Sequence, residues 1–415
     1  MSIAILGGGI SGLSLCEILY SNYSITCDLY EKEGDFGGLC RTRYIDGYTY
    51  DVSGGHVFNS KSKAVLEYVF SKISMEEWIK SERRAKILYD ESTILDYPFE
   101  FSLSQLPTEI SVECIEGLYT RENKRCTNLE EFFINTFGRG IYDHYLKQYN
   151  EKIWKTPLNK MDYNWVEGKL PLPDRKDILA RTLSQTASEN SMVHSSYYYP
   201  KEGGIRSLIN AISTGLPKGN IYGIVENIEI ENNRKFVNGK EYDLIINTIP
   251  LPELSTIITN MPQGVKKSIE SLCYNSLLTY IFESDPDNDW SWLYIPNLKI
   301  PTHRLVYQGN FSKKNAPYGR SSFTAEVTTR DESSEPQIRE ELVRCFGKQP
   351  LDSQFTKYAY VIYDLKRSTN YSIIEQYFME SGIYLHGRFA RWTYPNMDDC
   401  IKKSMDLAIE IISSL

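Results

Sequence analysis

The alternation of apolar and polar positions predicts a strand–helix–strand unit at the start of the chain. Residues 3 to 6 are continuously apolar, as in a buried strand, and residues 11 to 20 follow a helical pattern with small residues on the side that would face a sheet. A second apolar run, residues 25 to 31, ends at Glu31. The pattern therefore predicts one βαβ unit.

Three glycines separate the first strand from the helix with the spacing G-x-G-x-x-G. Gly7 permits a tight turn, Gly9 lets the backbone approach a pyrophosphate, and Gly12 lets the helix pack closely on the strand. The phosphates would meet the helix N-terminus. Glu31, nineteen residues after Gly12, stands where an acid would bind the ribose hydroxyls of an adenosine half. Strand, turn, helix and acid together predict a dinucleotide-binding site.

A second glycine pair bears on which dinucleotide is bound. Gly37 and Gly38 lie in the segment KEGDFGGLCRT, shortly after Glu31. Extended flavin proteins carry a glycine pair there so that the chain can pass close to the pyrophosphate, whereas simple NAD dehydrogenases usually lack it. Taken alone the pair is also compatible with an ordinary loop, but behind this turn it favours FAD over NAD.

The patterning of the remaining chain predicts two further regions. Residues 102 to 190 carry apolar and aromatic positions at three- and four-residue spacing, as in LEEFFINTFGRGIYDHYLKQYNEKIW, and predict a helical insertion. Residues 81 to 101 and 270 to 365 alternate in short runs separated by turn residues, which predicts an antiparallel sheet. Residues 242 to 251, and then the final strand GIYLHGRF and helix MDDCIKKSMDLAIEII, return to the parallel sheet.

The predicted fold class is therefore α/β, with a discontinuous Rossmann-like FAD-binding domain, a helical insertion domain and an antiparallel β-sheet domain. The predicted boundaries place residues 1–80, 195–268 and 380–415 in the FAD-binding domain, residues 102–194 in the helical substrate domain, and residues 81–101 and 269–379 in the sheet domain.

Composition and charge limit the partners of the chain. It has 415 residues, 41% of them apolar, which is enough for a substantial core. A formal net charge of −8 does not supply the positive field that would draw it to nucleic acid or anionic lipid. Its eight cysteines form no CxxC pair, which suits a reducing cytoplasm. The N-terminal stretch lacks the basic flank and cleavage site of a signal peptide, and no apolar run is long enough to span a bilayer, so we expect a cytoplasmic protein without membrane insertion.

Three internal segments carry candidate chemistry. The loop YDVSGGHVFNS contains His56 beside a glycine pair, although a histidine there is more often structural. In DYPFEF, Tyr97 and Phe99 flank a proline-fixed bend suited to gripping a flat base, and core packing is the commoner explanation of such aromatics. Arg304 lies in the strand-like run PTHRLVYQG, where a charge needs a partner, either a diphosphate or a buried carboxylate.

The C-terminal segment GRFARWTYPNMDDCI is the most informative. The last strand ends at Gly387 and Arg388, a loop holds Trp392 and Tyr394, and Asn396 opens a helix. The N-terminal amides and positive dipole of that helix could face the pyrimidine oxygen of a flavin. Asn396 also fits the simpler role of helix N-cap.

Taken together, these segments resemble the UDP-galactopyranose mutase family, and more closely its eukaryotic branch than its bacterial one. The resemblance covers nearly the whole chain, in order, through GGGISGLS, GGLCRT, SGGHVF, YPFEF, YLKQYNEKIW, YYYPKEGGI, WLYIP, HRLVYQGNFS and GRFARWTYPNMD. Amine and porphyrinogen oxidases share the first glycine turn and part of the C-terminal motif, but are not expected to share YPFEF or YNEKIW.

The resemblance implies a set of residues for each part of the site. The FAD-binding residues would be Gly7, Gly9, Ser11, Gly12, Glu31, Lys32, Gly38, Leu39, Arg388, Asn396, Met397 and Asp398, with His56 on the loop against the flavin N5 edge. The substrate-binding residues would be Tyr97, Phe99 and Glu100 for uridine, Asn150 and Trp154 for nucleotide and sugar, and Trp292, Tyr294, Tyr360 and Tyr394 around the diphosphate and sugar. Arg304 and Lys169 would stabilise the diphosphate, and no metal is implied.

Three positions depart from the family pattern or leave its meaning open. Glu100 stands where eukaryotic members usually have glutamine, and Lys169 takes the place of a second diphosphate arginine, keeping the charge but not the bidentate fork. Both leave open which nucleotide sugar is bound, with UDP-galactose, UDP-N-acetylgalactosamine and dTDP-fucose as candidates. Arg84 aligns with an arginine that eukaryotic members use with NADPH, and a surface salt bridge explains it equally well.

The activity implied by the resemblance is isomerisation between pyranose and furanose forms of a nucleotide-diphosphate hexose, as in the formation of galactofuranose for cell-surface polysaccharides. Reduced FAD would attack the anomeric carbon through N5 and form a covalent adduct, from which the sugar recloses as a furanose. NADPH or another donor would reduce the flavin. An FAD-dependent amine or porphyrinogen-type oxidase, or a noncatalytic flavin-binding protein, remains as an alternative, and a homodimer is left open.

Overall fold

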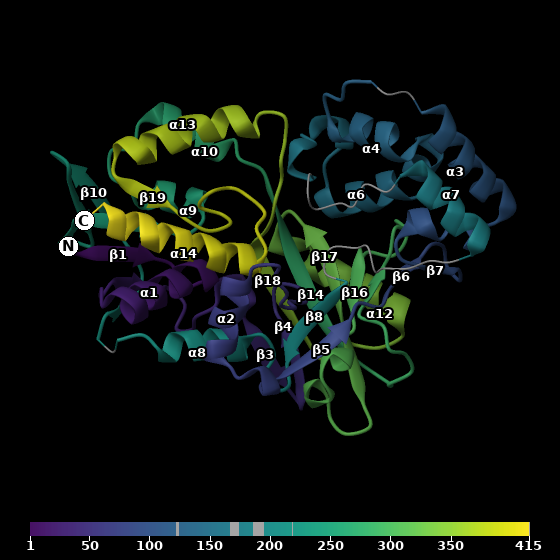
Figure 1. Cartoon of the computed structure of the whole chain (residues 1–415), viewed down its shortest axis with the longest axis horizontal. Coiled ribbons are helices and arrows are strands. Elements are labelled where there is room, and N and C mark those ends of the chain that lie inside the picture. The colour runs from purple at the N-terminus through teal and green to yellow at the C-terminus, as the bar shows by residue number, and fades with distance from the viewer. Residues whose placement is uncertain (122–123, 167–173, 186–194, 218, 415) are drawn as a thin grey trace.

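The computed structural model describes residues 1–415 apart from residues 122–123, 167–173, 186–194, 218 and 415. Figure 1 shows helices around a parallel sheet at the left, a larger sheet in the lower centre and right, and a group of helices at the upper right. This arrangement confirms the predicted α/β class with a Rossmann-like region, helices and an antiparallel-rich sheet. The exact domain boundaries stay a prediction.

The parallel sheet contains the predicted βαβ unit. Its strand order is β19-β13-β1-β2-β9, with bounds β1 Ile3–Leu6, β2 Asp28–Tyr30, β9 Ile221–Tyr222, β13 Leu244–Asn247 and β19 Ile383–Leu385. The second strand is shorter than the predicted run from residue 25. The amide of Ile25 bonds to the carbonyl of Leu19 at 3.0 Å, so this residue ends the preceding helix, α1 (Ile10–Tyr23), instead of joining the sheet.

Helices cover both faces of this sheet because its strands are apolar on both sides. Ile3 and Ile5 of β1 pack with α1, α2, α8 and α14, whereas Ala4 and Leu6 pack with α9, α10 and α13. The bounds of these further helices are α2 Lys63–Lys72, α8 Arg206–Thr214, α9 Leu251–Ile257, α10 Gln263–Glu270, α13 Arg367–Glu380 and α14 Met397–Ser413. The first and last helices are thereby joined, with a hydrogen bond of 2.9 Å from Ser14 to Ser404.

The second sheet is mostly antiparallel. Its order is β18-β14-β17-β16-β15-β6-β7, in which only the β15–β6 pair is parallel among the strands described. The bounds are β6 Ala85–Leu88, β7 Ile94–Asp96, β14 Tyr274–Ser284, β15 Trp292–Tyr294, β16 Arg304–Val306, β17 Ser321–Thr329 and β18 Asp352–Val361. The strands predicted within 81–101 and 270–365 therefore lie in one sheet. Helix α11 (Gln308–Phe311) contacts β17, and α12 (Glu335–Phe346) lies beside the sheet in Figure 1.

Three smaller β structures complete the chain. β3 (Thr42–Ile45) pairs with β4 (Tyr48–Asp51), and β10 (Ile228–Glu231), β11 (Arg234–Val237) and β12 (Lys240–Tyr242) form a meander. β5 (Trp78–Glu82) pairs antiparallel with β8 (Ser196–Pro200). The predicted boundary between residues 80 and 81 falls within β5, because the partner strand of β5 comes from a distant part of the sequence that short-range patterning does not reveal.

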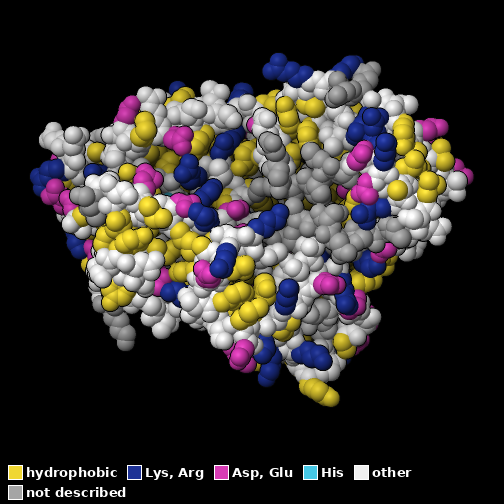
Figure 2. All heavy atoms as spheres, viewed as in Figure 1, with side chains coloured by type: hydrophobic (Ala, Val, Ile, Leu, Met, Phe, Trp, Pro, Cys, Tyr) yellow, Lys and Arg dark blue, Asp and Glu magenta, His cyan; other side chains and the backbone are white. Residues whose placement is uncertain are grey.

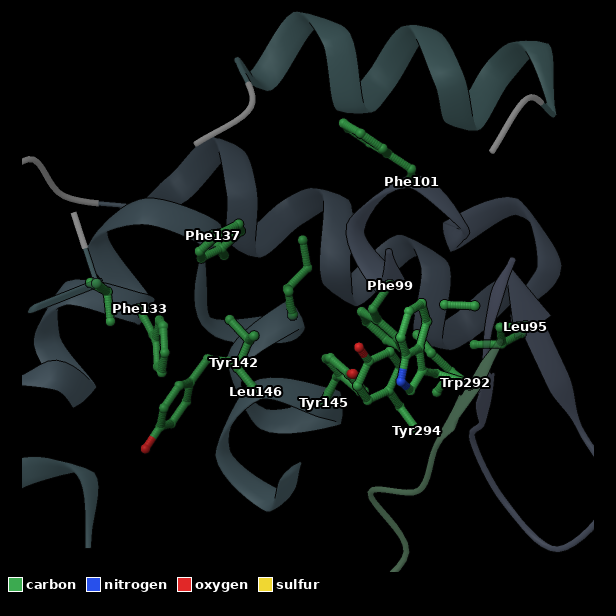
Figure 3. Packing of buried hydrophobic residues seen from close by; sticks show 14 of the residues in the cluster. Leu95, Phe99, Phe101, Phe133, Phe137, Tyr142, Tyr145, Leu146, Trp292 and Tyr294 are labelled. Carbon is green, nitrogen blue, oxygen red and sulfur yellow. The ribbon is translucent and has the colours of Figure 1, made fainter. Parts of the chain in front are cut away.

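The predicted helical region forms α3 Thr108–Thr120, α4 Leu129–Phe137, α5 Arg139–Ile141, α6 Lys147–Trp154 and α7 Arg175–Ser184. A π-helical turn, Tyr142–Leu146, leads directly into α6. Figure 3 shows Phe133, Phe137 and Tyr142 between these helices, and Phe99, Tyr145, Trp292 and Tyr294 gathered where the helices meet the larger sheet. One apolar cluster thus connects helices and sheet. None of the helices described is long and apolar enough to cross a bilayer.

Candidate functional site

A cavity of about 860 Å³ extends from the glycine turn after β1 to the larger sheet. Its lining includes Gly7, Gly9 and Ser11 of the turn, but not Gly12. It also includes residues of the second glycine segment, the His56 loop, the strand carrying Arg304 and the C-terminal loop. On the face drawn in Figure 2, Lys and Arg are interspersed with Asp and Glu, so no large patch of one charge surrounds the molecule on this side.

The two glycine segments lie against each other at one end of this cavity. The amide of Gly37 donates to the carbonyl of Gly8 at 2.8 Å, and a β-bridge joins Gly9 to Gly37. Gly7 has φ of +102°, and a Cβ on Gly12 would lie 2.0 Å from the carbonyl oxygen of Gly7. Only glycine fits at these two positions, and the result is a turn with bare backbone toward the cavity.

Glu31 closes the same end of the cavity. Its carboxylate accepts the Gly8 amide at 2.7 Å and the Glu33 amide at 2.9 Å, which fixes it beside the turn. Lys32, also in the lining, pairs with Glu253 at 2.9 Å. The backbone of the glycine turn therefore holds the carboxylate of Glu31, the predicted ribose-binding acid, in place.

The C-terminal loop packs on this turn although it is distant in sequence. Gly387 has φ of +91°, and a Cβ there would approach the Ser11 hydroxyl to 2.9 Å. The guanidinium carbon of Arg388 lies 4.4 Å from the ring centre of Tyr394, and Nη2 of Arg388 donates to the carbonyl of Pro395 at 2.7 Å. Asn396 forms a capping box with Asp399 at the start of α14, so its predicted simpler role is present. Arg388, Asn396, Met397 and Asp398 all line the cavity.

His56 reaches the cavity on a loop held by a buried carboxylate. Asp51 accepts the Thr42 hydroxyl at 2.6 Å, the His56 amide at 3.1 Å and the Gln308 side-chain amide at 2.9 Å. Burial raises the pKa of Asp51 to about 7 in spite of these donors. Burial, helped by the positive charge of Arg388, lowers the pKa of His56 to about 4, so its imidazole is neutral at pH 7.

Arg304 lies on β16 with a buried acid as its partner. Its Nε and Nη2 donate to one oxygen of Glu326 at 3.0 Å and 2.6 Å, and the other oxygen of Glu326 accepts the Gly55 amide at 3.0 Å. His303 Nε2 lies 3.6 Å from the Glu326 oxygen that Arg304 contacts. The sequence left two possible partners for Arg304, a diphosphate or a buried carboxylate. The buried carboxylate is present, and Arg304 also lines the cavity.

Aromatic rings form the walls beside Arg304. Tyr360 and Tyr394 are parallel with ring centres 6.0 Å apart, and Trp154 packs edge-on against both. The Trp154 ring nitrogen donates to Asn150 at 3.2 Å, and Asn150 donates to the carbonyl of Leu146 at 2.8 Å. The predicted helical-region residues thus lie behind the two tyrosines. Trp292 and Tyr294 line the cavity directly.

The predicted uridine segment lies beyond this wall. Phe99 is fully buried and stacks on Tyr145 with ring centres 4.8 Å apart, while Tyr97 stacks on Tyr294 at 4.9 Å. Burial raises the pKa of Glu100 to about 7. Among the described residues, Tyr97, Phe99, Glu100, Asn150 and Trp154 are outside the lining of the main cavity. Lys169 lies outside the described residues.

Sequence reasoning missed several residues of this site. Arg83 lines the cavity, although the resemblance points to the next residue, Arg84. Arg84 instead forms an exposed ion pair with Asp289. Tyr149 is packed edge-on against Tyr294 at 5.5 Å. Glu326 could have been found as an acid inside the otherwise uncharged strand SSFTAEVTT. Within the part of the chain that the structure describes, no cluster of His, Cys, Asp or Glu is suited to a metal ion.

Comparison with known proteins places this geometry in a fold group. Residues 5–71 match a family model described as an NAD(P)-binding Rossmann-like domain. A reduced UDP-galactopyranose mutase has a similar structure, with a TM-score of 0.90 and 22% identity over 100% of this chain and 94% of that chain. A putative protoporphyrinogen oxidase from Exiguobacterium sp. 255-15 has a TM-score of 0.73 and 15% identity, over 100% of this chain and 99% of that chain. A CLA-producing fatty acid isomerase from P. acnes has a TM-score of 0.67 and 12% identity, over 98% of each chain. The fold resemblance inferred from the sequence is confirmed.

Proposed function

We propose that the protein is a flavin-dependent nucleotide-sugar mutase that interconverts the pyranose and furanose forms of a nucleotide-diphosphate hexose, UDP-galactose or a close relative. The observation that carries this proposal is the continuity of one cavity from the glycine turn to Arg304 and the Tyr360–Tyr394 pair. A dinucleotide at the turn and a sugar diphosphate at the arginine would therefore meet in one space.

The residues at the turn fit FAD. The bare backbone of Gly7 to Gly9, with Gly38 laid against it, leaves room for a pyrophosphate, and Glu31 is fixed where it can bind ribose hydroxyls. The start of α14, a helix of 17 residues, borders the same cavity and supports a partial negative charge on a flavin ring. A bound, reduced flavin supplies a nucleophile for the anomeric carbon without any protein nucleophile.

Arg304 would bind the diphosphate and stabilise the charge that appears on it as the anomeric C–O bond breaks. Glu326 holds the Arg304 guanidinium in place, because two N–H groups of Arg304 donate to one buried carboxylate oxygen of Glu326. The parallel tyrosines Tyr360 and Tyr394 would hold the sugar between polar hydroxyls and flat rings. Positioning and exclusion of water then account for most of the catalysis.

His56 would handle a proton at the flavin edge. Its imidazole is neutral at pH 7, and its Nδ1 is buried without a hydrogen-bond partner among the described residues. Asp51 fixes the loop by accepting the His56 backbone amide, and His56 lines the cavity. Such a neutral ring can accept a proton at one nitrogen and donate from the other.

A second candidate function is an FAD-dependent oxidase of the amine or porphyrinogen type, favoured by the likeness of this fold to a putative protoporphyrinogen oxidase. An oxidase would consume dioxygen and would need no nucleotide sugar. The guanidinium of Arg304 in the lining of the cavity favours the mutase, because a protonated amine substrate gains nothing from a cation in its pocket.

The test is incubation of FAD-loaded protein with UDP-galactofuranose after reduction by dithionite, with chromatography of the products and an oxidised sample as control. The mutase proposal expects pyranose only in the reduced sample. Equal conversion in both samples contradicts the role of reduced flavin. Dioxygen uptake with an amine, and no conversion of UDP-galactofuranose, UDP-N-acetylgalactosamine or dTDP-fucose, supports the oxidase instead.

A further inference from the structure

Two adjacent arginines between β5 and β6 point to different environments. The backbone is extended there, since the Arg83 amide bonds to Ser195 at 2.8 Å and the Arg84 carbonyl accepts the Ser291 amide at 2.7 Å. Successive side chains of an extended chain point to opposite sides. Arg84 pairs with Asp289 at the surface and is 55% exposed, whereas Arg83 lines the cavity.

The guanidinium of Arg83 lies among three aromatic rings. Its central carbon is 4.7 Å from the ring centre of Tyr97, 5.3 Å from that of Trp292 and 5.8 Å from that of Tyr294. Its Nη2 donates to the Tyr294 hydroxyl at 2.6 Å. Aromatic faces hold a guanidinium in a fixed plane and remove part of its water, which prepares it for a charged ligand.

Arg83 and Arg304 border the same tyrosine. Tyr294 accepts the hydrogen bond of Arg83, and it is the register partner of Arg304 between β15 and β16. Tyr149 packs on Tyr294, and Tyr145 stacks on Tyr149 with ring centres 5.5 Å apart. Both arginines thus lie beside Tyr294, and all three residues line the cavity.

The charge balance at Arg304 also favours a second cation. Burial would raise the pKa of Glu326, but the attraction of Arg304 and the donors His303 and Gly55 outweigh burial and lower that pKa to about 2. Glu326 is therefore ionised and balances the charge of Arg304 at neutral pH. Arg304 therefore attracts a diphosphate less strongly than a cation without a counter-ion would, and a second guanidinium beside it would add net positive charge. Lys169, the other cation that the sequence assigns to the diphosphate, lies outside the described residues.

We propose that Arg83 is a second guanidinium ligand for the diphosphate of a nucleoside-diphosphate sugar, acting beside Arg304. This inference rests on the proposed function, because it takes the substrate to be a nucleotide sugar. Planar guanidinium groups bind phosphate oxygens through paired donors, and two of them can hold the two phosphates of a diphosphate at once. Arg83 would act on binding of the substrate and of the released nucleoside diphosphate.

The experiment compares binding of UDP and of uridine to the FAD-loaded protein by calorimetry. Arg83→Gln is expected to weaken UDP binding roughly 10- to 100-fold and to leave uridine binding within about twofold. Arg83→Lys, which keeps the charge without the fork, should fall between Arg83→Gln and the unaltered protein. Arg84→Gln is the matched control and should bind both ligands normally. FAD content and the visible flavin spectrum check that each variant is folded.

The outcomes separate this inference from the function. Unchanged UDP binding by Arg83→Gln overturns the inference and leaves the mutase proposal intact. An equal loss of affinity for UDP and for uridine also overturns it, because Arg83 would then only hold the surrounding aromatic rings in place and would not bind the diphosphate. UDP binding that depends on Arg83 without any sugar conversion supports the inference while the mutase proposal fails. No binding of either UDP or dTDP by the unaltered protein overturns both.

Discussion

The guanidinium of Arg304 donates two hydrogen bonds, of 3.0 Å and 2.6 Å, to a single oxygen of the completely buried Glu326. The same carboxylate receives the backbone amide of Gly55, the residue before His56. One buried acid therefore sets the position of the arginine and of the loop that carries the histidine. A buried pair of this kind contributes little net stability, but it costs much to break.

Replacement of Glu326 by glutamine should destabilise the protein by about 3–5 kcal/mol, because it leaves the charge of Arg304 largely buried and without its counter-ion. Urea unfolding at pH 7 measures this change. Glu91→Gln is the matched control, since Glu91 pairs with Lys299 at 2.8 Å but its side chain is 73% exposed, and no measurable change is expected there. A loss for Glu326→Gln no larger than that of the control contradicts this account.

The same carboxylate gives a prediction for acid pH. Its pKa in the folded protein, about 2, lies below the ordinary value of 4.5, so the folded state holds the proton less tightly than the unfolded state does. The stability contributed by Glu326 should be complete above about pH 4.5 and should be lost as the pH falls toward 2. Unfolding free energies of the unaltered protein and Glu326→Gln, measured from pH 7 to 3, should therefore converge as the pH falls. Parallel curves contradict this.

Gly12→Ala should prevent folding of the turn and binding of FAD. A methyl group at Gly12 would lie 2.0 Å from the carbonyl oxygen of Gly7, and that oxygen belongs to a backbone fixed by β1. Gly34→Ala is the control, because nothing lies within 4 Å of a Cβ at Gly34. The flavin absorbance of the purified proteins reports the result. Normal flavin content in Gly12→Ala contradicts the close packing that the structure shows.

The sequence predicted the parts of this site that depend on neighbouring residues in the chain. The glycine turn, Glu31 and the helix start at Asn396 each follow from a short pattern, and the structure contains all three. Contacts between distant strands were not predictable in this way. The partner of Arg304 lies on β17, and nothing in the segment PTHRLVYQG indicates Glu326 as that partner.

Helix patterning missed a further feature of the site. The π-helical turn at Tyr142–Leu146 leads directly into α6, and Tyr145 of the turn stacks on Tyr149 of α6 with ring centres 5.5 Å apart. A pattern of three- and four-residue spacing is insensitive to one extra residue in a turn. Likewise, Arg83 and Arg84 differ only in the side of the chain to which they point, and that depends on the strand pairing around them.

Glu100→Gln should stabilise the protein at pH 8 and leave it unchanged near pH 4. Burial raises the pKa of Glu100 to about 7, above its ordinary value of 4.5, so the folded state keeps the proton that the unfolded state loses. Ionisation of this carboxyl therefore costs stability as the pH rises from about 4.5 to 7, and the neutral amide removes that cost. Unfolding by urea across this range measures the difference. Glu109→Gln, at an exposed position on α3, is the control and should show no such trend.

Arg304→Met should lower kcat/KM of the proposed mutase reaction by about 100-fold or more while FAD stays bound, because the cation that would meet the developing diphosphate charge is lost. The single variant leaves Glu326 buried without its partner, so the double variant Arg304→Met with Glu326→Gln tests the same loss without an unpaired charge. Both variants should lose activity. The single variant should also be less stable than the unaltered protein, whereas the double variant should be more stable than the single variant. Arg320→Met, which removes surface ion pairs with Glu283 and Asp285, is the control and should keep full turnover. Steady-state kinetics with UDP-galactofuranose, together with flavin content, distinguish these cases, and a double variant that turns over normally removes Arg304 from the reaction.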